Sequence, residues 1–135
     1  MSRIRYRSAK PQEGHLGAVR ARCVGDHVLV RGVSPVSAQG KAVAIGDPYG
    51  QAWRCVQLIE EALEAFGAGL SNVVATRIYL TDRDDWSAVA RAHAEAFEIN
   101  APVTTMVIVQ ALLDPLWRVE MEVEAVCPAS DPENG

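Results

Sequence analysis

The last strand-like run of the chain, residues 117–126, alternates glutamate with apolar residues at a period of two. Successive side chains of a β-strand point to opposite faces, so this pattern predicts a strand with one acidic and one apolar face. The acidic face carries Glu120, Glu122 and Glu124, and the apolar face carries Val119, Met121 and Val123. Neighbouring carboxylates repel one another and need water, a cation or a cavity at a subunit boundary. This strand is therefore either one wall of a polar site or the ordinary solvated face of a sheet.

The length and composition indicate a single globular domain. A chain of 135 residues can bury a sizeable core, and its 49% hydrophobic and 22% charged residues are ordinary for such a domain. We expect one domain over residues 1–127, with residues 1–14 irregular and a disordered tail at 128–135.

Targeting and redox features predict a cytoplasmic protein. No apolar run approaches the ~20 residues that a membrane span requires, and the basic amino terminus lacks the apolar core of a secretory signal. The cysteines, Cys23, Cys55 and Cys127, are odd in number and lack metal-ligand spacing. We interpret them as small core residues in a reducing compartment.

Charge is distributed unevenly. Residues 1–31 carry a net charge of +5 and the remainder −9, which gives the overall −4. This asymmetry could indicate a nucleic-acid-binding arm, or pairing of Arg20, Arg22 and Arg31 with the acidic strand. No aromatic platform interleaved with lysines is present, so pairing is favoured and nucleic-acid binding is not expected.

Periodicity and turn signals divide the chain into strands and two helices. Asp47-Pro48 reads as an N-cap followed by a first-turn proline, and Gly67 reads as the end of that helix. Residues 82–85 offer several N-caps for a second helix, which carries His93 on its apolar stripe, where a packing histidine is the simplest interpretation. Strands are predicted at 17–24, 27–33, 73–81, 103–112 and 117–126, with a short one at 41–44.

This order predicts an α+β fold with both helices on one face of the sheet. Two helices can cover only that face. The opposite face still carries valines and isoleucines, so we expect oligomerisation to bury it.

Several motifs in this order are similar to those of one known family. They are residues 73–82, Asp85-Trp86 before an alanine-rich helix, residues 102–109, Leu113-Asp-Pro and Val119-Glu-Met-Glu. Together they resemble the reactive intermediate deaminase (RidA/YjgF) family, from about Gly17 to Val126. The resemblance implies a chorismate-mutase-like fold with a mixed sheet and a homotrimer with small-molecule clefts between subunits. It also implies hydrolysis of enamines and imines to ammonia and a keto acid, with no cofactor or metal.

Three positions depart from the family pattern. Active members have an arginine that pairs with the substrate carboxylate, and Thr104 occupies that position here, after Pro102. A threonine offers one neutral hydrogen bond where a guanidinium offers two charge-assisted ones. A cysteine found in many members is Met106, and a tyrosine of the early strand is Ala18. The chain therefore resembles an arginine-lacking branch.

Two positions agree with the family pattern. The glycine that ends the second strand is kept as Gly32, and Glu120 fits the glutamate taken to position a hydrolytic water. That alignment depends on a one-residue insertion near residues 114–115, so Glu122 is the alternative. Carboxylates beside a cleft are suitable general bases, which makes Glu120 the candidate catalytic residue.

Positive charge from another strand can replace the missing arginine as a ligand anchor. Arg20, Arg31 and Arg118 are the candidates, although ordinary ion pairing is the simpler role for each. Three functions remain open at this point: an imine hydrolase using Glu120, a non-catalytic small-molecule-binding trimer, and an RNA-cleaving protein. The net charge of −4 disfavours the third.

Overall fold

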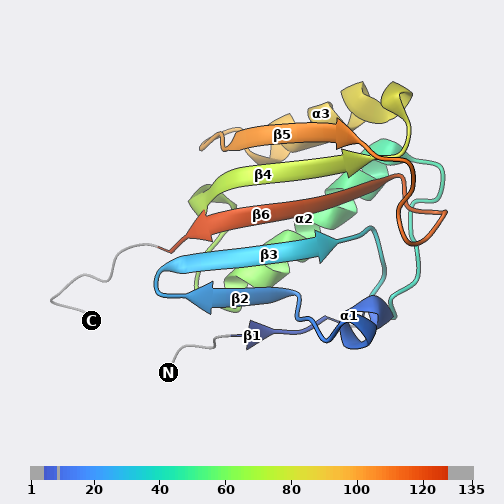
Figure 1. Cartoon of the computed structure of the whole chain (residues 1–135). Helices are drawn as coiled ribbons and strands as arrows, with labels where there is room; N and C mark the ends of the chain where they lie inside the picture. The colour runs from blue at the N-terminus through green and yellow to red at the C-terminus, as the bar shows by residue number, and fades with distance from the viewer. Residues whose placement is uncertain (1–4, 9, 128–135) are drawn as a thin grey trace, which may run out of the picture.

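The computed structural model of the protein describes residues 5–8 and 10–127, so the predicted tail at 128–135 lies outside the described residues. Figure 1 shows one six-stranded sheet with the order β1-β2-β3-β6-β4-β5. The strands are β1 (Arg5–Tyr6), β2 (Ala21–Val24), β3 (His27–Val33), β4 (Val73–Leu80), β5 (Val103–Ile108) and β6 (Val119–Val126). The helices are α1 (Pro11–Leu16), α2 (Pro48–Glu64) and α3 (Trp86–Ala96), with 3-10 turns η1 (Leu70–Asn72) and η2 (Arg83–Asp85).

The sheet is mixed. Strands β4 and β5 are parallel, and α3 makes the crossover between them, while every other described pair of neighbours is antiparallel. The last strand, β6, inserts between β3 and β4 and so joins the two halves of the sheet. This arrangement confirms the predicted α+β fold with a mixed sheet.

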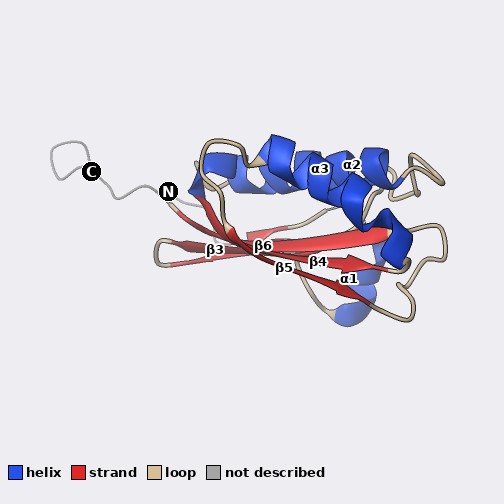
Figure 2. Ribbon diagram, turned by 90° about the horizontal axis from the view of Figure 1, so that it is seen from above, coloured by secondary structure: helices blue, strands red, loops and turns tan. Residues whose placement is uncertain are grey.

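Helices α2 and α3 cover one face of the sheet, as predicted, and Figure 2 shows α1 on the opposite side. The start of α2 follows the sequence signal, because the Asp47 side chain accepts a hydrogen bond from the Gly50 backbone N–H at 3.0 Å. The core lies between this helix layer and the sheet. Its largest buried apolar side chains include Ile59, Leu63, Ile78, Leu80 and Met121.

The alternation predicted for β6 is confirmed. The apolar side chains Val119, Met121 and Val123 are at most 1% exposed, because they face the helix layer. The glutamates between them are partly exposed on the other face. On that same open face, β5 exposes 75% of Val103 and 38% of Val107.

Several strand boundaries differ from the predictions. The strand predicted at 17–24 begins at Ala21, the strand predicted at 73–81 ends at Leu80, and the strand predicted at 117–126 begins at Val119. Residues 41–44 form only an isolated bridge between Val36 and Ala42, because positive φ angles at Gly40 and Ala44 break the extended backbone. The strand predicted at 103–112 ends at residue 108, because its neighbour β4 ends at Leu80 and offers no further ladder.

The amino-terminal segment, which was expected to be irregular, contains two elements. Strand β1 pairs with β2 through Arg5 opposite Arg22 and Tyr6 opposite Ala21. Helix α1 follows, with a proline at its first turn and Gly17 in the left-handed conformation at its end. Within the described part of the chain, no helix is both long enough and apolar enough to cross a membrane.

Candidate active site

An irregularity in β3 shapes the candidate site. The register between β3 and β6 shifts between Val30 and Val33, and Gly32 within this bulge has a φ of 60°. A side chain at this φ would be strained, which explains a glycine here. The Gly32 carbonyl accepts a hydrogen bond from Lys10 Nζ at 2.7 Å. The bulge is therefore tied to the segment that precedes α1.

Gly32 and Glu120 line the same pocket, which we call the Glu120 pocket. Its volume is about 280 Å³, and α1 forms one of its walls on the open face of the sheet. Arg31 and Ala18, both considered from the sequence, line it as well. The remaining lining residues are Lys10, Gln12, Glu13, Leu16, Val19, Ala111, Leu112 and Leu113. The pocket therefore combines apolar walls with a few charged groups, which is typical of small-molecule sites.

Glu120 lies at the end of a short chain of hydrogen bonds. Ser34 Oγ donates to Glu120 Oε1 at 3.0 Å, and Lys10 Nζ donates to Ser34 Oγ at 2.8 Å. The Lys10 ammonium also lies 3.9 Å from Glu120 Oε1. Both contacts reach Oε1, and within the described residues no donor bonds to Oε2. A carboxylate held in this way keeps one oxygen for a ligand or a water molecule.

Lys10 is a functional candidate that sequence reasoning missed. Only 7% of the residue is exposed, and its Nζ lies 4.8 Å from the centroid of the Trp117 ring. Burial lowers the pKa of Lys10, and the charge of Glu120 acts in the opposite direction. The local sequence offers no signal for this role, because the Lys10 side chain contacts Gly32, Ser34, Trp117 and Glu120, all distant in the sequence.

Glu122, the alternative to Glu120, is engaged by other groups. Its Oε1 accepts hydrogen bonds from Arg77 Nη1 at 2.8 Å and Tyr79 Oη at 2.9 Å. Its Oε2 lies 3.6 Å from Arg31 Nε. Glu120 lines the pocket with Gly32 and Glu122 does not, so Glu120 is the better placed of the two candidates to meet a ligand.

Thr104 and Met106 lie away from the Glu120 pocket. Thr104 Oγ1 is 2.8 Å from Thr76 Oγ1, which in turn is 2.8 Å from His93 Nε2. Met106 packs against the core. Within one described chain, these two positions therefore do not meet Glu120, and a shared site would need a second subunit. Burial lowers the pKa of His93, in keeping with a packing histidine.

The three candidate arginine anchors have different surroundings. Arg20 is 2% exposed, lies 3.4 Å from Glu13 and does not line the Glu120 pocket. Arg118 donates two hydrogen bonds to Asp85, at 2.8 and 3.0 Å. Arg31 lines the pocket. Arg20, Arg22 and Arg31 were predicted to pair with the acidic strand, and within the described residues only Arg31 forms an ion pair with a glutamate of β6.

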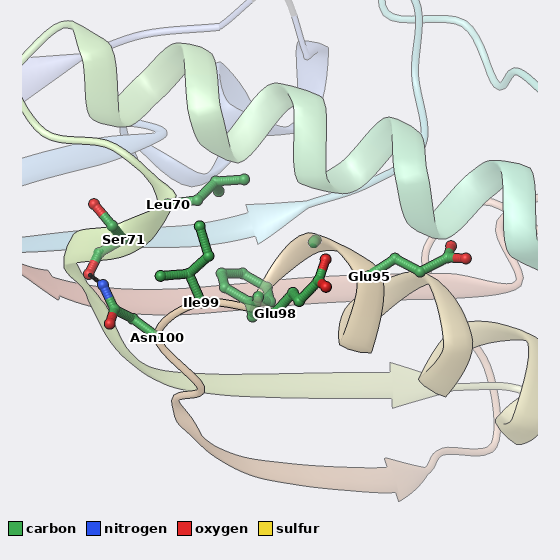
Figure 3. A pocket seen from close by; sticks show the side chains of 8 residues that line it. Leu70, Ser71, Glu95, Glu98, Ile99 and Asn100 are labelled. Atoms are coloured by element: carbon green, nitrogen blue, oxygen red, sulfur yellow. Dashed lines mark hydrogen bonds between the residues drawn. The ribbon is translucent and has the colours of Figure 1, made fainter.

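Another hollow, at the carboxyl end of α3, contains none of the predicted site residues. Figure 3 shows Leu70, Ile99 and Asn100 around it, and Asn100 Nδ2 donates to the Ser71 carbonyl at 3.1 Å. Ile99 is 89% exposed there. Among the described residues, no group of three or more His, Cys, Asp or Glu side chains is arranged to hold a metal ion.

The comparisons with known proteins agree with this architecture. The family model for endoribonuclease L-PSP matches residues 12–127. An uncharacterized protein of Streptomyces coelicolor is 38% identical over 127 residues, or 94% of each chain. A RutC family protein of Pyrococcus abyssi is 30% identical over 102 residues, covering 76% of this chain and 80% of that one.

A solved structure gives the same result. The crystal structure of a YjgF family member from Mycobacterium tuberculosis is 38% identical and superimposes with a TM-score of 0.82, over 93% of this chain and 99% of that one. The fold and the pocket thus define a small α+β protein with a candidate ligand site on the open face of its sheet. The chain belongs to the RidA/YjgF family, to which the endoribonuclease L-PSP model corresponds.

Proposed function

We propose that the protein hydrolyses small imines or enamines, with Glu120 as the general base that activates water. The observation that carries this proposal is the placement of Glu120: its carboxylate lines the pocket, and Ser34 and Lys10 hold one oxygen. A partly buried carboxylate with one oxygen fixed and one free is suited to orienting a water molecule.

The reaction needs only proton transfers. Glu120 takes a proton from water as the water oxygen attacks the imine carbon, and it passes this proton to the imine nitrogen, which gives a carbinolamine and restores the carboxylate. The carboxylate then takes the proton of the carbinolamine hydroxyl group and delivers it to the leaving nitrogen as the C–N bond breaks, and a carbonyl compound and ammonia are released. An enamine enters the same sequence after it gains a proton at carbon and loses one from nitrogen, which converts it to the imine. Ser34 and Lys10 hold the Glu120 carboxylate in position between turnovers.

The substrate would be anchored without the family arginine. Arg31 and Lys10 supply positive charge to the pocket, and Leu16 and residues 111–113 supply apolar walls.

We propose that the functional unit is a homotrimer in the cytoplasm, in which Thr104 and Met106 of a neighbouring subunit complete the cleft. The apolar side chains exposed on β5 support such an interface. Light scattering should then give about three chains per particle, and a stable monomer would contradict the shared cleft.

The test is hydrolysis of imines that an amino-acid oxidase generates in the cuvette from a panel of amino acids. Keto-acid release should be faster with the wild-type protein than without it. Thr104→Arg, which restores the family's anchor, should raise the rate for imines that carry a carboxylate. Thr104→Met changes the same position to a long side chain without adding charge and serves as the control.

Two other outcomes would replace this proposal. If no imine is hydrolysed by either protein, and a small ligand still binds, the chain is a non-catalytic binding trimer using the same pocket. The family model's description raises RNA cleavage as a further candidate. Incubation with single-stranded RNA should give no cleavage, because tight RNA binding depends on phosphate neutralisation and the chain carries a net charge of −4.

A further inference from the structure

A second pocket lies on the other side of Lys10. It is formed by β1, the loop that follows β3 and the exposed side of α2, and its volume is about 200 Å³. Lys10 lines both this second pocket and the Glu120 pocket. Arg7, Ser8, Arg20, Arg54 and Glu61 also line the second pocket.

Positive charge dominates the second pocket. Arg7, Lys10, Arg20 and Arg54 line it against a single lining carboxylate, Glu61. Arg20 has Glu13 as an ionic partner at 3.4 Å, and Lys10 lies 3.9 Å from Glu120. Within the described part of the chain, Arg7 and Arg54 have no carboxylate within 4.0 Å. The lining therefore carries positive charge that the described chain does not neutralise.

The guanidinium groups are held in place by neutral partners. Arg54 donates from Nε to the Val36 carbonyl at 2.7 Å and from Nη1 to Gln57 Oε1 at 3.3 Å. Arg20 donates from Nη2 to Ser8 Oγ at 3.0 Å. Among the described residues, neither Arg54 Nη2 nor Arg20 Nη1 has a hydrogen-bond acceptor. Each side chain thus keeps N–H groups for a ligand, at little further cost in side-chain entropy.

Two of the cations that line the second pocket are buried, which makes an anionic partner more favourable. Arg20 is 2% and Lys10 7% exposed, and burial lowers the pKa of both groups although Glu13 and Glu120 oppose the shift. An anion in the second pocket would offset part of the desolvation of these two cations.

We propose that the second pocket binds the phosphate group of a small molecule. Guanidinium and ammonium groups line the same recess, and each guanidinium can donate two parallel hydrogen bonds. A phosphate offers enough acceptor oxygens for these donors, whereas a carboxylate offers only two. A recess of this size accepts one phosphate and a small substituent. A nucleic acid would instead require cations spread along a track.

The test is isothermal titration calorimetry with inorganic phosphate and, separately, glycerol phosphate, at constant ionic strength in chloride. Sodium acetate serves as the carboxylate comparison. The variant is Arg54→Met, which removes one guanidinium group from the surface of α2. The control is Arg83→Met, which removes the same charge from an exposed side chain in η2. Arg54→Lys keeps the positive charge but loses the pair of parallel hydrogen bonds that a guanidinium can donate.

Phosphate should bind the wild type and the Arg83→Met variant alike, and acetate should bind more weakly than either phosphate compound. Arg54→Met should weaken phosphate binding by about tenfold or more, and the affinity of Arg54→Lys should lie between those of Arg54→Met and the wild type.

If Arg54→Met fails to give a folded protein by circular dichroism, Arg7→Met takes its place with the same expectation. Absence of phosphate binding, or equal losses in the Arg54→Met and Arg83→Met variants, would overturn the proposal. Tight binding of single-stranded RNA in place of both phosphate compounds would also overturn it.

Discussion

Replacing Lys10 by methionine tests how far one buried ammonium holds the candidate site together. Methionine keeps most of the apolar stem of the side chain and removes the ammonium that lies over the Trp117 ring. It deletes the hydrogen bonds to the Gly32 carbonyl at 2.7 Å and to Ser34 Oγ at 2.8 Å. It also removes the cation 3.9 Å from Glu120.

The expected loss of stability follows from what these partners retain. A hydrogen bond to a charged group contributes about 1.5–3 kcal/mol, and removing one member of a buried ion pair costs about 3–5 kcal/mol. Three features place the expected loss of stability near the lower end of these ranges. Ser34 keeps its bond to Glu120, the Glu120 side chain is 23% exposed, and the buried ammonium no longer has to be desolvated. We expect the free energy of unfolding to fall by about 2–3 kcal/mol.

The assay is urea unfolding followed by circular dichroism, at one fixed protein concentration because association would shift the midpoint. The control is Lys41→Met, which removes the same charge from the chain's other lysine, an exposed side chain. Lys10→Met should lower the midpoint by roughly 1–1.5 M urea, and Lys41→Met should change the free energy of unfolding by less than about 0.5 kcal/mol. Equal midpoints for the two variants would refute the structural role assigned to Lys10.

Two further predictions concern His93 and Gly32. Burial lowers the pKa of His93, so protonation favours the unfolded chain, and the wild type should lose stability as the pH falls below about 6.5. His93→Gln should weaken that dependence in thermal melts between pH 7 and pH 5; an unchanged slope would argue against a buried neutral histidine. Gly32→Ala should destabilise the fold by about 1–2 kcal/mol in urea unfolding, because φ is 60° there. Gly14→Ala, where an added Cβ would meet no atom within 4 Å, should be neutral or stabilising, and the reverse order would contradict the described bulge.

Much of the fold was predictable because its signals are local. The alternation in β6 is visible in residues 117–126 alone, and Asp47-Pro48 marks the start of α2 through contacts within one helical turn. Strand ends were harder to predict. The strand expected at 103–112 stops at residue 108, because the end of a strand depends on the length of its neighbour.

The candidate site was only partly predictable. Glu120, Gly32 and Arg31 came from the sequence, and they line one pocket. Helix α1 was missed because it has six residues and none of them is buried, so it shows no apolar periodicity. Lys10 was missed because its hydrogen-bond partners lie 22 and 24 residues further along the chain. Such contacts exist only after the sheet has formed.

The most direct test of the central claim is the imine hydrolysis rate of Glu120→Gln, measured beside Glu124→Gln. The two positions belong to the same acidic face of β6, but only Glu120 lines the pocket with Gly32. Glutamine preserves the size of the side chain and cannot act as a general base, which typically contributes 10²–10⁴-fold to the rate. The account predicts that Glu120→Gln lowers keto-acid release by at least about 100-fold, while Glu124→Gln stays within about twofold of the wild type. Equal rates for Glu120→Gln and the wild type would contradict the account.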